Sequence, residues 1–220
     1  MELKITVPTS LSDITLEQYK KYENVLKSNE TEDQASRFVN LKMLEIFCGI
    51  TYEHAAAMSL LDYESIVTQL YEVLQEKPKL VQKFKMGDST FGFIPNLEEI
   101  TFGEYIDLDT YIHDMDNIEK AMAVLYRPIV NQLKDKYTIQ EYKGDLFHQA
   151  MLKMPMDAVV GSIIFFYNLG SELSIVMMNS LQDQEVEQLT QQDLAESGDG
   201  TLISTNSLKE ILDDLKKSQI

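Results

Sequence analysis

The sequence predicts a mainly α-helical fold: a multi-helix domain that carries a small antiparallel β-sheet. Apolar residues recur at spacings of three and four along most of the chain, and several helix-starting capping boxes are present. Alternation of apolar and polar residues is confined to short stretches near the N-terminus and near residues 80–95. We expect one domain over residues 1–192, a flexible linker over 193–206 and a short amphipathic helix over 207–220.

One phrase of the sequence occurs twice and predicts how two helices begin. Residues 7–19 and 94–105 both read Val or Ile, Pro, a short gap, then Leu-x-acid-Ile-Thr-apolar-x-(Gln or Glu)-Tyr. Proline lacks the N–H that continues a strand ladder, so it marks the end of a strand. Thr followed three residues later by Gln or Glu is a capping box. We expect the same turn from strand to helix at both places.

The first half of the chain should contain a strand, several helices and a hairpin. The strand is expected at 3–7, where Leu3, Ile5 and Val7 alternate with polar residues. Helices are expected at 16–27, from the capping box at Thr31 to Gly49, briefly after Thr51, and from about 61 to just before Pro78. Residues 80–95 should form a hairpin around Gly87-Asp88, and the strand at 3–7 should complete a small sheet.

The second half should be helical again. Helices are expected at 102–114, 117–127, 144–153, 155–169 and 172–192, with a looser Tyr-rich region after Pro128 and a break at Gly170. The last short helix should begin at the capping signal Ser207-x-x-Glu210 and present a narrow apolar stripe.

Negative charge is concentrated in two segments. The net charge is −17; residues 97–119 hold eight acids and no Lys or Arg, and residues 183–220 hold nine acids against three Lys. Such a surface repels phosphate, so no binding of nucleic acid is expected. The simpler interpretation is a solvated face, and the alternative is a patch complementary to a basic partner.

No reactive centre emerges from the motifs, so we expect no enzyme, no cofactor, no metal and no small-molecule substrate. The single cysteine, Cys48, lies on an apolar stripe and is expected to be a buried small side chain. Calcium-loop and P-loop spacings fail at required positions. The longest apolar run, 158–167, is too short to span a bilayer, and no secretory signal begins the chain, so no membrane association is expected. The histidines lack metal-ligand spacing: they are His54, His113 and His148.

Three blocks of the sequence resemble a family of tailed-bacteriophage structural and assembly proteins, some of them tail-assembly-chaperone-like. The blocks are residues 91–108, 121–129 and 155–167, and the resemblance covers about residues 85–180. It carries no catalytic signature and transfers no site residues. It implies a non-enzymatic protein that contacts other phage structural proteins, in the host cytoplasm during assembly or in the virion, and an oligomeric state is one of its expectations.

The partner-binding elements are expected in two places. One is the acidic segment after Thr101, and the other is the apolar stripe of the last helix. Two other functions stay open: a permanent virion component, such as a collar ring or a packaged cargo protein, and an acidic inhibitor or nucleic-acid mimic of a host protein. The candidate residues are Glu104, Asp107, Asp109, Leu208, Ile211, Leu212 and Leu215.

Overall fold

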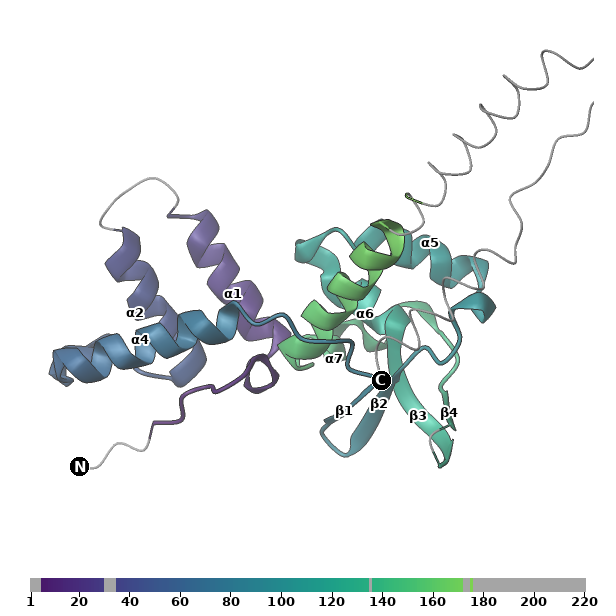
Figure 1. The fold of residues 1–220 in the computed structure, drawn as a ribbon, viewed down its shortest axis with the longest axis horizontal. Coiled ribbons are helices and arrows are strands. Elements are labelled where there is room, and N and C mark those ends of the chain that lie inside the picture. Colours follow the sequence, from purple (N-terminus) through teal and green to yellow (C-terminus); the bar gives the residue numbers. More distant parts are fainter. Residues whose placement is uncertain (1–4, 30–34, 135, 172–174, 176–220) are drawn as a thin grey trace, which may run out of the picture. The chain divides into compact units, whose positions relative to one another are not determined.

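The computed structural model describes residues 5–29, 35–134, 136–171 and 175. The chain divides into two compact units, Met1–Gly161 and Ser162–Ile220. The described part is mainly helical and contains one four-stranded antiparallel sheet, which confirms the predicted fold class (Figure 1). No helix within these ranges combines the length and the apolar character that crossing a bilayer requires.

The first part of unit Met1–Gly161 is helical. A 3-10 turn at Leu11–Asp13 is followed by four α-helices around an apolar core, in which the rings of Tyr22 and Phe47 lie 5.3 Å apart. The helices begin and end close to the predicted positions because caps and glycine mark them; Gly49, for example, has the positive φ that ends a helix. They are α1 (Leu16–Lys27), α2 (Ala35–Cys48), α3 (Tyr52–Ala57) and α4 (Leu60–Leu74).

The rest of this unit combines the sheet with further helices. The strands follow the order β1-β2-β3-β4, and all neighbours are antiparallel. The helix α6 is buried along nearly its whole length and precedes β3 directly. The elements are β1 (Lys83–Met86), β2 (Ser89–Phe93), α5 (Phe102–Tyr111), α6 (Ile118–Leu125), β3 (Tyr126–Leu133), β4 (Lys136–Ile139) and α7 (His148–Met151), with 3-10 turns at Leu97–Glu99, Met115–Asn117 and Gly144–Phe147.

The sheet is completed by residues 126–139 and not by the N-terminal segment, which corrects one prediction. Residues 5–9 lie outside the sheet, and the Pro8 carbonyl instead accepts a hydrogen bond of 2.9 Å from Gln69 on α4. The predicted helix over 117–127 ends at Leu125, because Tyr126 pairs with Phe93 in the sheet and packs its ring 5.2 Å from that of Phe84. The Tyr-rich region expected to be loose contains the strand β4.

Both copies of the repeated phrase form the capping box that the sequence predicts. Gln18 N–H donates to Thr15 Oγ1 and Glu104 N–H donates to Thr101 Oγ1, each at 3.3 Å. The preceding segments differ, since Ile94 follows strand β2 whereas Val7 lies outside the sheet. The device that starts the helix is therefore repeated, and the strand before it is not.

Residues 156–171 are helical, which corrects the predicted break at Gly170. A glycine within a helix lowers its stability without necessarily ending it. The predicted helix over 172–192, apart from the helical Ile175, lies outside the described residues, as do the predicted linker over 193–206 and the helix over 207–220.

Candidate partner-binding surface

Helix α5 carries the most exposed aromatic side chain of the described residues, and its two faces have different roles. Glu104 and Leu108 lie on the buried face, one helical turn apart, and Ile112 continues this face at the C-cap. Phe102, Tyr105, Ile106 and Asp109 occupy the opposite side at spacings of three and four residues. We call these four residues the outer face of α5.

The outer face of α5 exposes large apolar side chains to solvent. Phe102 is 78% exposed, Tyr105 54% and Ile106 45%. Apolar side chains that gather on one exposed helix face are typical of protein–protein contact sites. Aromatic residues are also enriched at such interfaces. The outer face of α5 is therefore the best candidate for partner binding in the described part of the chain.

Several acids of segment 97–119 are neutralised by cations from elsewhere in the fold. Lys20 on α1 lies 2.6 Å from Glu119, and Lys27 lies 3.1 Å from Asp116. Asp114 is bound within its own turn, where hydrogen bonds led by that from the Asn117 amide lower the pKa of its carboxyl. The segment is thus less negative in the folded protein than its sequence implies.

Three acids near the outer face of α5 keep their charge available. Glu98, Glu99 and Asp109 are exposed and form no ion pair with any residue that the structure describes. Glu98 and Glu99 belong to the 3-10 turn just before the helix, which the Asn96 side chain caps. The candidate surface therefore combines apolar side chains with free carboxylates.

The predicted residue Glu104 lies in the interior and not on this surface. It is 4% exposed, its Oε1 lies 2.7 Å from Arg127 Nη2, and its Oε2 accepts hydrogen bonds from the Thr101 backbone and hydroxyl. A carboxylate with these partners holds α5 against β3. Glu104 is therefore a structural residue, because burial removes it from contact with any partner.

The other predicted residues have three different outcomes. Asp107 is half-buried and accepts a hydrogen bond of 2.6 Å from the hydroxyl of Tyr142. Asp109 is exposed on the outer face of α5, as a partner-binding residue requires. The apolar stripe of the last predicted helix lies outside the described residues; it comprises Leu208, Ile211, Leu212 and Leu215.

A second exposed feature is the end of the β3–β4 hairpin. Residues 130–133 are four consecutive exposed residues of β3, although successive side chains of a strand point to opposite faces. Both sides of β3 are therefore in solvent at these residues, whereas Tyr137 on β4 is half-buried and its hydroxyl donates a hydrogen bond to the Phe93 carbonyl. Leu133 is 77% exposed and Val130 63%, and the exposed Lys134 and Lys136 flank the turn. We call residues 130–134 and 136–138 the arm.

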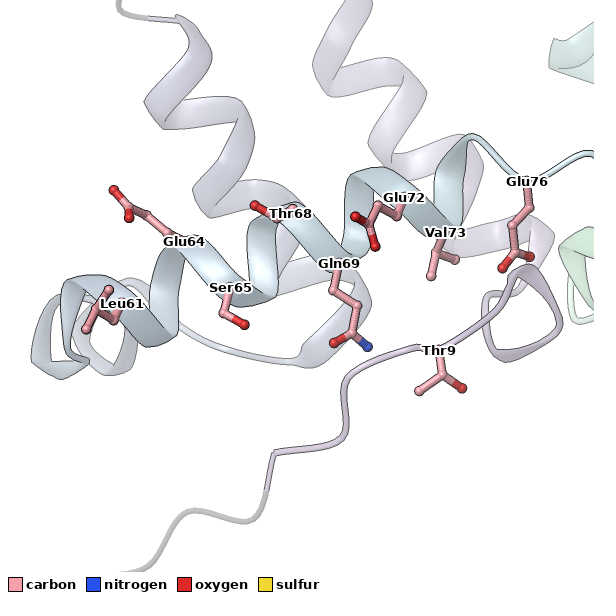
Figure 2. A pocket seen from close by; sticks show the side chains of 9 residues that line it. All are labelled: Thr9, Leu61, Glu64, Ser65, Thr68, Gln69, Glu72, Val73 and Glu76. Atoms are coloured by element: carbon pink, nitrogen blue, oxygen red, sulfur yellow. The ribbon is translucent and has the colours of Figure 1, made fainter.

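A groove also runs along α4 beneath the N-terminal segment (Figure 2). Its volume is about 750 Å³. One wall is held in place by the hydrogen bond from Gln69 to Pro8 and by a bond of 3.0 Å from Leu11 N–H to Glu76. Figure 2 shows Ser65 and Gln69 pointing toward the segment that carries Thr9, while Glu64 points away from it. The lining residues are Thr9, Leu61, Glu64, Ser65, Thr68, Gln69, Glu72, Val73 and Glu76.

The groove gathers no constellation of reactive groups. Glu64 and Glu72 are spaced along α4, and Glu76, beyond the end of that helix, accepts a hydrogen bond from the backbone of Leu11. Within the described ranges, no three His, Cys, Asp or Glu side chains come together as metal ligands. The Cys48 thiol is half-buried outside the groove, and burial raises its pKa to about 11, so it is protonated at neutral pH.

Sequence reasoning missed the apolar half of the candidate surface. Phe102, Tyr105 and Ile106 repeat at helical spacing on the side of α5 opposite Leu108. A helix that is apolar on two sides can bury only one of them against its own domain. That double pattern was a usable signal, whereas the ion pair between Glu104 and Arg127 depends on a tertiary contact across 23 positions that local spacing does not reveal.

Comparisons with protein-family models, curated proteins and solved structures found no match. The fold and the surface together define a mainly helical protein with a small antiparallel sheet and an exposed apolar and acidic helix face.

Proposed function

We propose that this chain is a non-enzymatic protein of tailed-phage virion morphogenesis that works by protein–protein contact in tail or head–tail assembly. The observation that carries the proposal is the outer face of α5, where Phe102, Tyr105 and Ile106 are exposed beside free carboxylates. A partner that fits it presents apolar side chains together with Lys or Arg. The phage context comes from the sequence resemblance.

Two of the three blocks that carry this resemblance build and support the candidate surface. Residues 91–108 form the end of β2, a capped turn and most of α5, and residues 121–129 form most of α6 and the start of β3. The ion pair between Glu104 and Arg127 joins these two blocks. Two of the three blocks therefore coincide with the elements that build and hold the outer face of α5, as expected if that face is the part that meets phage partners; the third block, residues 155–167, lies outside these elements.

The nucleic-acid-mimic alternative has less support. A mimic needs many carboxylates that are free and spaced like phosphates on one face. Here Glu104, Asp116 and Glu119 are paired with cations from β3 and α1. On the outer face of α5 the exposed carboxylate of Asp109 accompanies exposed apolar side chains, which fits a protein partner better than a DNA-binding enzyme.

Co-expression with the products of the neighbouring genes tests the proposal. The chain should co-purify with at least one tail, portal or head–tail product, and Phe102→Ser with Ile106→Ser should weaken that binding at least about tenfold. The matched control is Leu61→Ser, which removes an equally exposed apolar side chain from α4. The proposal is wrong if no such product binds, or if the control weakens binding as much as the α5 variant.

Two further measurements refine the role. Mass spectrometry of purified particles separates an assembly factor, which should be absent, from a permanent component such as a collar or packaged protein, which should be stoichiometric. Deleting residues 196–220 tests the predicted C-terminal stripe, since unchanged partner binding would remove that stripe from the mechanism.

A further inference from the structure

The charge of the sheet is opposite to that of the protein as a whole. The two segments that build it, residues 77–93 and 126–143, hold eight Lys or Arg and three acids, a net charge of +5. Because the whole chain carries −17, the remainder carries −22. One of the eight cations, Arg127, is buried against Glu104, so the count describes the sequence and not the surface alone. Charge is unevenly distributed along the polypeptide, which favours contacts between unlike regions of different molecules.

The arm carries two exposed lysines beside exposed apolar side chains; Asp135 lies between the lysines in the sequence, so residues 130–138 have a net charge of +1. Lys134 and Lys136 stand beside Leu133 and form no ion pair with a described residue. An exposed two-stranded ribbon is marginally stable by itself, and exposed apolar residues on it gain free energy when a partner covers them. The lysines and exposed apolar side chains of the arm therefore match the carboxylates and exposed apolar side chains of the outer face of α5.

The two surfaces do not cover each other within one molecule. Phe102 on α5 and Leu133 on the arm both lie in unit Met1–Gly161, and each is more than three-quarters exposed. Each surface is open to another copy of the chain. We propose that the chain associates head to tail, with the arm of one copy binding the outer face of α5 of the next; this proposal rests on the proposed function in assembly.

This geometry determines the kind of assembly. The contact joins two different surfaces, so it is heterologous, and each bound pair still has one free arm and one free α5 face. Such contacts continue into a closed ring or an open filament. The ion pairs expected are between Lys134 or Lys136 and the carboxylates of Asp109, Glu98 or Glu99, so the association weakens as salt rises.

The test is sedimentation of the full chain between about 10 and 500 µM, the range in which small interfaces associate. We expect species larger than a monomer that dissociate on dilution. Leu133→Asp on the arm, or Phe102→Ser with Ile106→Ser on α5, should raise the concentration for half-association at least about tenfold. Leu61→Ser should leave it unchanged, and circular dichroism verifies that each variant is folded.

Mixing the two defective variants gives the decisive result. The arm variant keeps its α5 face and the α5 variant keeps its arm, so the mixture should form a 1:1 dimer and nothing larger. A second pair of variants exchanges the charges of the two surfaces. Lys136→Glu and Asp109→Lys should each weaken association when present alone, and a mixture of the two variants should associate again. A wild-type chain that stays monomeric throughout, or mixtures that do not associate, would overturn the proposal.

The outcome is separable from that of the proposed function. If the wild type is monomeric but a phage product binds the outer face of α5, head-to-tail association is wrong and the proposed function stands. If the chain self-associates but no phage product binds it, the proposed function is wrong and head-to-tail association stands.

Discussion

Arg127 on β3 and Glu104 on α5 form an ion pair in the interior, with Nη2 and Oε1 2.7 Å apart and less than a tenth of either side chain exposed. Glu104 also accepts two hydrogen bonds from Thr101, so its carboxylate is well satisfied. The Arg127 guanidinium lies over the Tyr142 ring at 5.9 Å. This pair connects the candidate surface to the sheet, and its removal should be costly because burial makes an unpaired charge unfavourable.

The first prediction concerns this pair. Glu104→Gln should lower the free energy of unfolding by about 3–5 kcal/mol, because it leaves a buried guanidinium without its counter-charge. Urea unfolding followed by circular dichroism measures the effect. Asp109→Asn is the matched control on the exposed side of the same helix and should stay within about 0.5 kcal/mol of the wild type.

A double replacement separates a charge effect from a packing effect. Glu104→Leu combined with Arg127→Met removes both charges and should recover most of the loss. A loss below about 1 kcal/mol for Glu104→Gln alone would show that the pair does not hold α5 against β3.

The second prediction uses two glycines with opposite surroundings. A Cβ on Gly161 would lie 2.5 Å from the backbone oxygen of Lys79, and a backbone atom cannot rotate away as a side chain can. Gly161→Ala should therefore destabilise the protein by about 1–3 kcal/mol. A Cβ on Gly103 in α5 would meet nothing within 4 Å, so Gly103→Ala should stabilise it by about 0.5–1 kcal/mol.

Thermal unfolding of the two glycine variants gives the answer directly, because the expected shifts in Tm have opposite signs. A rise in Tm for Gly161→Ala would mean that the helical residues 156–161 do not approach the Lys79 backbone closely. A fall for Gly103→Ala would mean that α5 is not a regular helix at that position.

The third prediction is a loss of stability in alkali. Burial raises the pKa of Cys48 to about 11 and that of Tyr137 to about 12, above the usual values of 9.0 and 10.0. The neutral forms are thus favoured in the native state. Their contribution to stability is fully present below about pH 9, and it is lost as the pH rises from about 9 to 12, where the unfolded chain ionises first.

Urea unfolding at several pH values between 8 and 11.5 measures this slope. Cys48→Ala should reduce the dependence of the unfolding free energy on pH in the lower part of this range, and Tyr137→Phe should reduce it in the upper part. The phenylalanine variant also loses the hydrogen bond of 2.8 Å to the Phe93 carbonyl. A stability that does not change over this range would contradict the burial of both groups.

Local patterns in the sequence were sufficient for the helices with caps and not for the sheet. Thr15 and Thr101 could be placed as N-caps because a capping box is complete within four residues. Strand β3 was mistaken for the end of a helix because its identity depends on pairing with Phe93, 33 positions earlier. The wrongly predicted N-terminal strand has the right alternation, but β2 pairs with β1 and β3 instead, and the Pro8 carbonyl accepts a hydrogen bond from Gln69 on α4.

The same limit applies to the candidate surface. Asp109 could be found because the acidic run is visible in one dimension, whereas the burial of Glu104 follows from the partner that folding brings to it. Charge counts alone overestimated the negative field of segment 97–119, since Lys20 and Lys27 on α1 neutralise part of it. The exposed fraction of each side chain separates the free acids from the buried or paired ones, and this fraction is known only from the folded structure.

The last prediction compares the two matched capping boxes. Thr101 Oγ1 donates to the Glu104 carboxylate at 2.7 Å, whereas Thr15 Oγ1 donates to the uncharged Gln18 amide at 3.0 Å. Hydrogen bonds to a charged group are roughly twice as strong as those between neutral groups. Thr101→Ala should therefore cost about 2 kcal/mol in the free energy of unfolding, and Thr15→Ala about 1 kcal/mol.

A double-mutant cycle shows whether the charge of Glu104 causes this difference. In a Glu104→Gln background the two alanine substitutions should cost about the same, because both boxes then end in an amide. Thr→Ser at either position keeps the hydroxyl and serves as the control, with a loss well below that of alanine. Equal losses for Thr101→Ala and Thr15→Ala in the wild-type background would instead mean that the buried carboxylate is held by Arg127 alone and adds nothing to its own helix cap.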